Sequence, residues 1–193
     1  MNRRLAWAAL AAVGIAAALA AQIRLQALFA TAEHPTTLLR SNHNADAALA
    51  RDWHRTLLDQ GTLDRMVTTE RFDYLWMLAL AAALVSITML ASALLERRAP
   101  RASRRLRRLA PAAALPAAVD AAENAVSLAM LADPLGFPEL LAPLHASLAW
   151  LKLACVVAVA VGASAYTLVA AVKGERHGDH DAVPPRLAAQ GPP

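Results

Sequence analysis

The sequence predicts an all-α fold, a four-helix transmembrane bundle with an extracytoplasmic helical hairpin between spans 1 and 2 and both termini in the cytoplasm. The chain of 193 residues is 58% hydrophobic, with a mean hydropathy of +0.37, which is too apolar for an ordinary soluble domain. Its uncharged stretches approach the roughly 20 residues that a helix needs to cross a bilayer. Runs of this length and continuity fit helices rather than the strands of a barrel.

Four stretches of low charge set the predicted spans, at about residues 5–29, 73–95, 108–132 and 146–172. Residues 1–173 then form a single transmembrane domain, and the polar, proline-containing residues 174–193 are predicted to be a disordered cytoplasmic tail. The first stretch ends near Ala18-Leu19-Ala20, which matches a signal-peptide cleavage pattern. Its apolar run is longer than the roughly 7–15 residues of a signal peptide, so we expect it to be retained as a span.

Basic residues set the predicted orientation. Arg3 and Arg4 precede span 1, Lys173 follows span 4, and the connection between spans 3 and 4 has no lysine or arginine. Seven arginines fill the connection between spans 2 and 3: Arg97, Arg98, Arg101, Arg104, Arg105, Arg107 and Arg108. The positive-inside rule therefore places both termini and this connection in the cytoplasm.

The same basic residues predict the partners. The net charge is +4, but the excess sits beside the predicted spans, so it indicates anionic lipid headgroups at Arg97–Arg108 rather than nucleic acid. A four-span chain of this size is also compatible with a homo-oligomer, although no feature of the sequence specifies an interface.

The long connection between spans 1 and 2 is predicted to be helical, over residues 36–71. Asn44 can cap a helix that runs to about Gln60 and stops at Gly61, with Trp53 and Leu57 on one face. A further helical stretch from about residue 62 is expected to continue directly into span 2. This outer segment is most simply an amphipathic hairpin that caps the bundle or lies on the membrane.

A polar stripe in the third span is the main candidate for a site. Asp120, Glu123, Asn124 and Ser127 have the spacing i, i+3, i+4 and i+7, which is one face of a helix, and Pro116 lies on the same stripe. An ionisable side chain inside a membrane costs about 2.5–3.5 kcal/mol on insertion scales and usually marks function. We therefore assign the intramembrane polar site to Asp120, Glu123, Asn124 and Ser127 of this stripe together with Lys152 of the fourth span.

Depth along the helices separates the charged residues. The height of each residue above the basic, cytoplasmic end of its span is counted at about 1.5 Å per residue. Asp120 and Glu123 then lie about 18 and 22 Å above that end, inside a hydrocarbon core of about 30 Å. Arg24, Asp73 and Lys152 come out at the outer interface, with Lys152 about 9 Å above Glu123. Two acids three residues apart should not both ionise in a dry setting, so we expect at least one of Asp120 and Glu123 to hold a proton.

The sequence predicts no cofactor and no metal. The predicted spans contain no histidine, which argues against a transmembrane haem; His34, His43, His54 and His145 are all expected on the outer side. Their spacing matches no metal pattern, and the single Cys155 excludes a dithiol redox motif. A membrane enzyme using the paired carboxyls lacks a recognisable nucleophile and base, so the sequence favours a protein that is not an enzyme.

The order of features resembles that of a group of uncharacterised bacterial four-span integral membrane proteins. The shared features are an Asp that opens the second span, here Asp73, a D-x-x-E-N motif in the third span, here Asp120 to Asn124, and a Lys that enters the fourth span, here Lys152. The resemblance implies a bacterial plasma (inner) membrane protein with multiple spans. It also implies that Asp73, Asp120, Glu123, Asn124 and Lys152 form a polar centre, and it implies no particular activity.

These observations leave two functions open. In the first, the chain is a small proton-coupled transport protein whose titratable centre is Asp120 and Glu123, with Lys152 as an outer gate or counter-charge. In the second, it is a non-catalytic membrane scaffold or partner-binding protein, whose polar stripe holds helices together at about 0.6–2 kcal/mol per contact. A cavity beside Glu123 would favour transport, and tight packing there would favour the scaffold.

Overall fold

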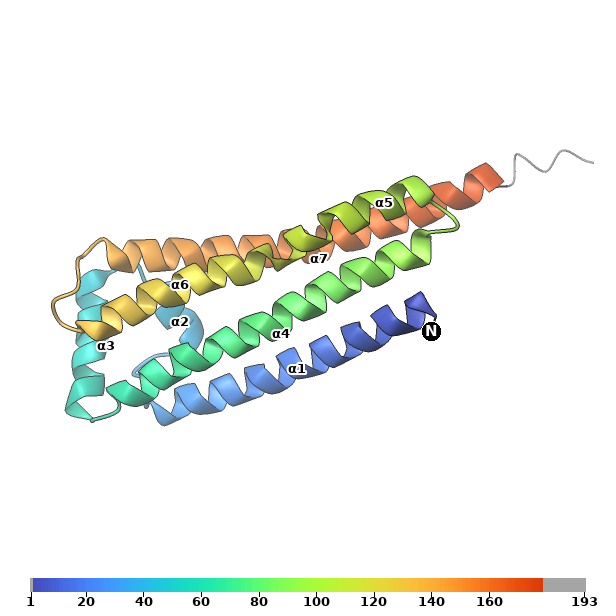
Figure 1. The fold of residues 1–193 in the computed structure, drawn as a ribbon. Helices are drawn as coiled ribbons and strands as arrows, with labels where there is room; N and C mark the ends of the chain where they lie inside the picture. The colour runs from blue at the N-terminus through green and yellow to red at the C-terminus, as the bar shows by residue number, and fades with distance from the viewer. Residues whose placement is uncertain (1, 179–193) are drawn as a thin grey trace, which may run out of the picture.

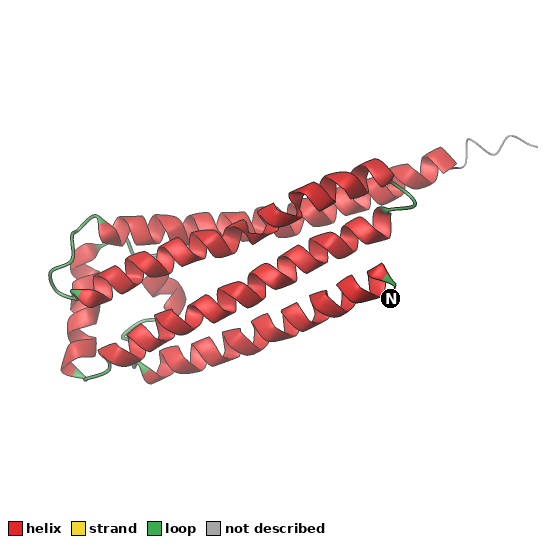
Figure 2. Cartoon of the chain, in the orientation of Figure 1, coloured by secondary structure: helices red, strands yellow, loops and turns green. Residues whose placement is uncertain are grey.

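A computed structural model describes residues 2–178, and within this part of the chain every regular element is a helix (Figures 1 and 2). Three helices are long and apolar enough to cross a membrane: α1 (Arg3–Thr31), α4 (Leu63–Leu95) and α7 (Leu141–Gly178), the last over Leu141–Ala170. The all-helical class and the presence of membrane-length helices are therefore confirmed.

Helices α1 and α4 form an antiparallel pair along most of their length (Figure 1). Gly14 of α1 lies so close to Ala83 that a Cβ atom added to it would be 2.9 Å from the Ala83 backbone N and Cα atoms. At the far end, Arg4 Nε donates a hydrogen bond to Ala93 O at 3.1 Å. These two contacts fix the register of the pair, in which Arg24 of α1 comes level with Asp73 of α4.

The single helix predicted over residues 108–132 is divided in the structure. Helix α5 (Pro100–Leu109) is followed by the 3-10 turn η1 (Ala110–Ala114) and then by α6 (Leu115–Ala132). Pro111 and Pro116 lack the N–H that a continuous α-helix needs, which accounts for the interruption. Helix α5 packs against the end of α4, where the Ser92 hydroxyl donates to Ser103 O at 2.9 Å.

The predicted outer segment forms two helices, α2 (Leu38–Asn42) and α3 (Ala47–Asp59), and α3 lies across one end of the long helices (Figure 1). Asp46 caps α3 in place of Asn44, because its carboxylate accepts hydrogen bonds from Ala48 N and Leu49 N. Gly61 ends this segment with φ of +67°, a conformation that favours glycine. As predicted, the next helix then runs without a break from Leu63 into the apolar part of α4.

Two clusters of packed apolar side chains lie at the α3 end. One cluster joins Phe29, Leu57, Met66 and Leu131, and another joins Ala50, Met130, Phe137 and Ala142. By contrast, the apolar window of α7 is not buried by the rest of the chain. Helix α7 continues to Gly178, so residues 174–178 of the predicted tail are helical, and residues 179–193 lie outside the described part of the structure.

Candidate functional site

Eight polar residues from three helices meet near the α3 end of the bundle, and we call them the polar cluster. They are Glu70 and Asp73 from α4, Asp120, Glu123, Asn124 and Ser127 from α6, and His145 and Lys152 from α7. Each helix contributes residues spaced by three, four or seven positions, which keeps them on one face. All are buried except Lys152, which is partly buried.

Lys152 connects α7 to both acids of the D-x-x-E-N motif. Its Nζ lies 2.7 Å from Asp120 Oδ1 and 2.6 Å from Glu123 Oε2. The side chains of both acids are 0% exposed, whereas 16% of the Lys152 side chain is exposed. This is a buried ion pair in which two carboxylates share one ammonium group.

Asn124 and Ser127 connect α6 to α4. Asn124 Nδ2 donates to Asp73 Oδ2 at 2.9 Å and, more weakly, to Glu70 O at 3.4 Å. The Ser127 hydroxyl hydrogen-bonds the Glu70 carboxyl. Asn124 and Ser127 therefore act here as links between helices, while they also hold two further carboxyls beside Asp120 and Glu123.

The structure brings together residues that the depth estimate from the sequence had separated. Asp73, expected at the outer interface with Arg24, is buried and belongs to the polar cluster, as the resemblance implied, whereas Arg24 is exposed on α1 and takes no part in it. Asp120 and Glu123 were expected below Lys152, with a gap of about 9 Å to Glu123 that extended side chains could close. In the structure both acids contact Lys152 directly. The depths predicted from the sequence were counted along the third span from Arg108.

The packing of α5 explains the error in depth. Ser103 lies beside Ser92, which is five residues before Arg97 on α4, so Ser103 already stands about 8 Å above the level of Arg97. Asp120 follows seventeen residues later and comes out at about 33 Å on this scale, compared with about 36 Å for Asp73. The two acids therefore rise to the level of Asp73 and Lys152.

Sequence reasoning missed Glu70 and His145. His145 was placed outside the spans, but it lies in the apolar stretch of α7, is buried, and has its Nε2 3.8 Å from Glu123 Oε1. Signals for both residues exist in the sequence, because Glu70 is three positions before Asp73 and His145 is seven positions before Lys152. Each spacing places the missed residue on the face that carries the recognised one.

The composition of the polar cluster is unbalanced in charge. Four carboxyls face one lysine, so the group would carry a net charge of −3 if every acid were ionised and His145 were neutral. A buried environment strongly disfavours uncompensated charge. The arrangement can therefore bind and exchange protons. Among residues 2–178, no group of three or more His, Cys, Asp or Glu side chains is arranged to hold a metal ion.

The α3 end next to the polar cluster contains two histidines outside the candidate spans. His34 Nδ1 accepts a hydrogen bond from Thr36 N at 3.2 Å, and its ring stacks on Phe29. Burial lowers the pKa of His34 to about 4 and also lowers the pKa of His54, whose Nδ1 donates to Pro134 O at 3.1 Å. Both imidazoles are therefore neutral at pH 7.

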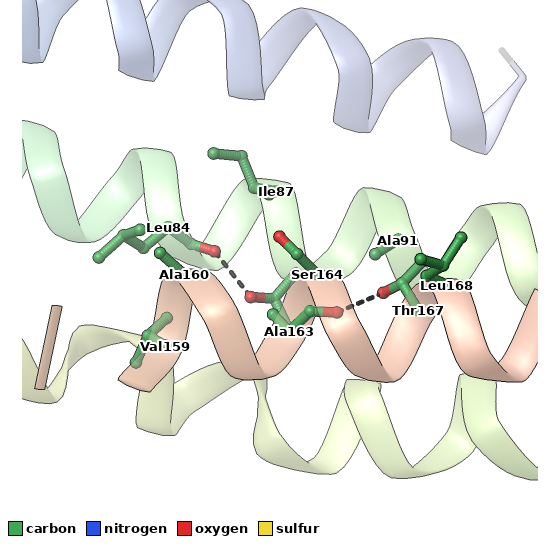
Figure 3. A pocket seen from close by; sticks show the side chains of 10 residues that line it. Leu84, Ile87, Ala91, Val159, Ala160, Ala163, Ser164, Thr167 and Leu168 are labelled. Atoms are coloured by element: carbon green, nitrogen blue, oxygen red, sulfur yellow. Dashed lines mark hydrogen bonds between the residues drawn. The ribbon is translucent and has the colours of Figure 1, made fainter. Parts of the chain in front are cut away.

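The opposite half of the bundle contains a cavity lined mainly by apolar side chains. This cavity of about 520 Å³ opens between α4 and α7, lined by residues such as Leu84, Ile87 and Leu168, and no member of the polar cluster lines it (Figure 3). Its threonine hydroxyls bond to their own helices, as Thr167 Oγ1 donates to Ala163 O at 2.7 Å (Figure 3). The cavity thus offers an apolar surface rather than a polar binding site.

Comparisons of the chain with protein-family models, with curated proteins and with solved structures give no match, so the arrangement of its own residues carries the functional argument.

Proposed function

We propose that the chain is a multi-pass protein of a bacterial inner membrane with four spans, formed by α1, α4, the divided α5–η1–α6 segment and α7. Three of these helices have the length and composition of spans, and α6 packs along both α4 and α7. The polar side chains that interrupt the apolar run of α6 point into the bundle rather than outward. By the positive-inside rule, the basic residues favour an orientation with both termini and α5 in the cytoplasm and the α2–α3 segment outside.

Within this membrane frame the polar cluster lies near the outer edge of the apolar belt. The path from Ser92 to Asp73 along α4 is about 28 Å, and the path from Arg4 to Arg24 along α1 is about 30 Å. Both lengths approach the roughly 30 Å thickness of the hydrocarbon core. Protons from outside would thus have a short path to the carboxyls.

The proposed activity is proton-coupled transport, with Asp120 and Glu123 as the titratable centre. The observation that carries it is the shared Lys152 ammonium, because protonating either acid removes half of the charge that holds α7 to α6. Proton binding would thereby weaken the contact between two helices and change their packing. Buried acids of this kind form proton relays in pumps and transporters, in which one group of helices moves against another around the binding site.

A flux measurement in vesicles tests the proposal. Purified protein is reconstituted, an inward pH gradient is imposed, and internal acidification is followed with a pH-sensitive dye, for the wild type and for D120N/E123Q. The matched control is E96Q, because Glu96 is a half-exposed acid that pairs with Arg3 and Arg107 outside the polar cluster. Transport predicts flux in the wild type and E96Q and its loss in D120N/E123Q. Equal flux in all three proteins, or none in any, would contradict it.

The second candidate is a non-catalytic scaffold, or a homo-oligomeric partner-binding protein. Tight packing beside Glu123 favours this function over transport, and Asp120 and Glu123 are both 0% exposed, in a network that ties α4, α6 and α7 together. This function predicts that D120N/E123Q loses stability in detergent while the wild type shows no pH-dependent flux. Transport instead predicts a wild-type flux that depends on pH, so the wild-type protein alone separates the two.

A further inference from the structure

A second groove lies in the apolar half of the bundle, and we call it the α5–α7 groove. Leu106 and Leu109 of α5 and Ala113 of η1 form one wall, and Gly162 and Tyr166 of α7 form the other. Its volume is about 320 Å³, at the small end of the roughly 300–1,000 Å³ that is usual for sites that bind small molecules.

The interior of the α5–α7 groove is suited to an apolar occupant. The Thr88 hydroxyl at its edge already donates to Leu84 O at 2.8 Å, so it is not free to bind a ligand. A Cβ atom added to Gly162 would meet no other atom within 4 Å, which shows that the space beside this residue is open. An occupant would therefore contact hydrocarbon walls and small side chains.

Charge is placed at one end of this groove. Arg101, Arg105 and Leu109 are spaced by four residues along α5 and share one face of the helix, and all three are exposed. The two arginines therefore lie on the same face of α5 as Leu109, which forms part of the groove wall. Arg107 faces elsewhere, since its guanidinium pairs with Glu96 at 3.2 Å.

We propose that the α5–α7 groove binds one acyl chain of an anionic phospholipid whose phosphate is held by Arg101 and Arg105. This inference rests on the membrane insertion proposed above. Guanidinium groups bind phosphate oxygens in a bidentate manner. The acyl chain would fill the open groove and cover its apolar walls. A second copy of the chain in this groove would bury the same two arginines, and its own net charge is also positive. An anionic lipid carries the opposite charge and is therefore the better occupant.

Retained lipid is the direct test. The protein is reconstituted in nanodiscs with equal amounts of phosphatidylglycerol and phosphatidylcholine, released, and analysed by native mass spectrometry. We expect the wild type to retain phosphatidylglycerol in preference to phosphatidylcholine, and R101Q/R105Q to retain at least about fivefold less. The matched control is R104Q/R108Q, which removes the same charge from the neighbouring face of α5 and should keep the preference.

A second pair of variants tests the acyl chain. G162L fills the open space beside Gly162 and should reduce retained phosphatidylglycerol, whereas A165L adds the same bulk at an exposed position of α7 that does not line the groove. Equal losses in R101Q/R105Q and R104Q/R108Q, or no loss in G162L, would overturn the proposal. A mass corresponding to a dimer without lipid would identify a second copy as the occupant and would also overturn it.

The flux measurement separates this inference from the proposed transport. Vesicles with wild-type flux but no preference for phosphatidylglycerol would overturn the lipid site alone. Retained phosphatidylglycerol without flux would overturn transport alone.

Discussion

The two halves of the bundle are held together in different ways. Near α3, the helices α4, α6 and α7 meet through the polar cluster, and two clusters of buried apolar residues lie beside it. In the other half, one groove opens between α7 and α4 and another between α7 and α5. In a bilayer, lipid chains solvate apolar helix surfaces as well as another helix does, so the apolar surface of α7 needs no protein neighbour, whereas buried polar groups need one.

The largest expected effect comes from removing the one cation of the polar cluster. K152M leaves Asp120 and Glu123 without their shared ammonium group and should lower the free energy of unfolding by about 3–5 kcal/mol. The measurement is reversible unfolding in detergent. The control L168M places the same new side chain on an exposed position of the apolar half and should change little. A K152M protein as stable as L168M would remove the distinction between the halves.

A smaller effect is expected from the link between α4 and α6. N124A leaves Asp73 Oδ2 without its donor and should cost about 1–3 kcal/mol in the same unfolding measurement. T88V removes a hydroxyl in the apolar half that bonds only to its own helix, at Leu84 O, and should be close to neutral. If T88V were the more damaging variant, the polar contacts would not be concentrated where we place them.

Two glycines allow the packing of helices to be compared directly. G14A forces a Cβ against the Ala83 backbone and should cost about 1–3 kcal/mol, because backbone atoms on both sides have to move. G162A meets open space and should be neutral or slightly stabilising, by up to about 1 kcal/mol, since alanine favours helix more than glycine does. Thermal unfolding of both variants in one detergent gives the comparison, and equal effects would contradict the close α1–α4 approach.

The smallest effect concerns pH at the α3 end. The folded protein keeps His34 neutral down to a pKa of about 4, whereas the unfolded chain protonates it near 6.5. The free energy of unfolding that this residue contributes is fully present above pH 6.5 and is lost as the pH falls toward 4. Between pH 7 and pH 6 the loss is less than about 1 kcal/mol. H34Q should flatten this part of the stability profile. An unchanged profile in H34Q would show that His34 is not buried as described.

Periodic patterns predicted part of this structure, and long-range packing decided the rest. The stripe from Asp120 to Ser127 and the helix across Trp53 and Leu57 were predictable, because a repeat of 3.6 residues places their side chains on one buried face. The resemblance placed Asp73 in the polar centre, but its level relative to Asp120 was not predictable by counting along each span, since it depends on where α5 packs along α4. The arginines of α5 indicated a connection between spans. Because they dominate its composition, this segment was not recognised from the sequence as an amphipathic helix with Leu106 buried.

Glu70 and His145 were missed for a related reason. Both lie just outside the spans predicted at 73–95 and 146–172, so a search that starts from uncharged runs excludes them before their spacing is considered. Extending the helical face of a recognised intramembrane charge by one or two turns in each direction would have found both residues.

The protonation of the four clustered carboxyls tests the central claim most directly. Infrared spectroscopy of the reconstituted protein distinguishes protonated carboxyl groups from ionised ones, and the variants E70Q, D73N, D120N and E123Q assign the bands. We predict that at pH 7 more than one of the four acids is protonated while Lys152 remains charged. Four ionised carboxylates at pH 7, unchanged in number across an imposed pH gradient, would contradict the claim that this cluster binds and releases protons.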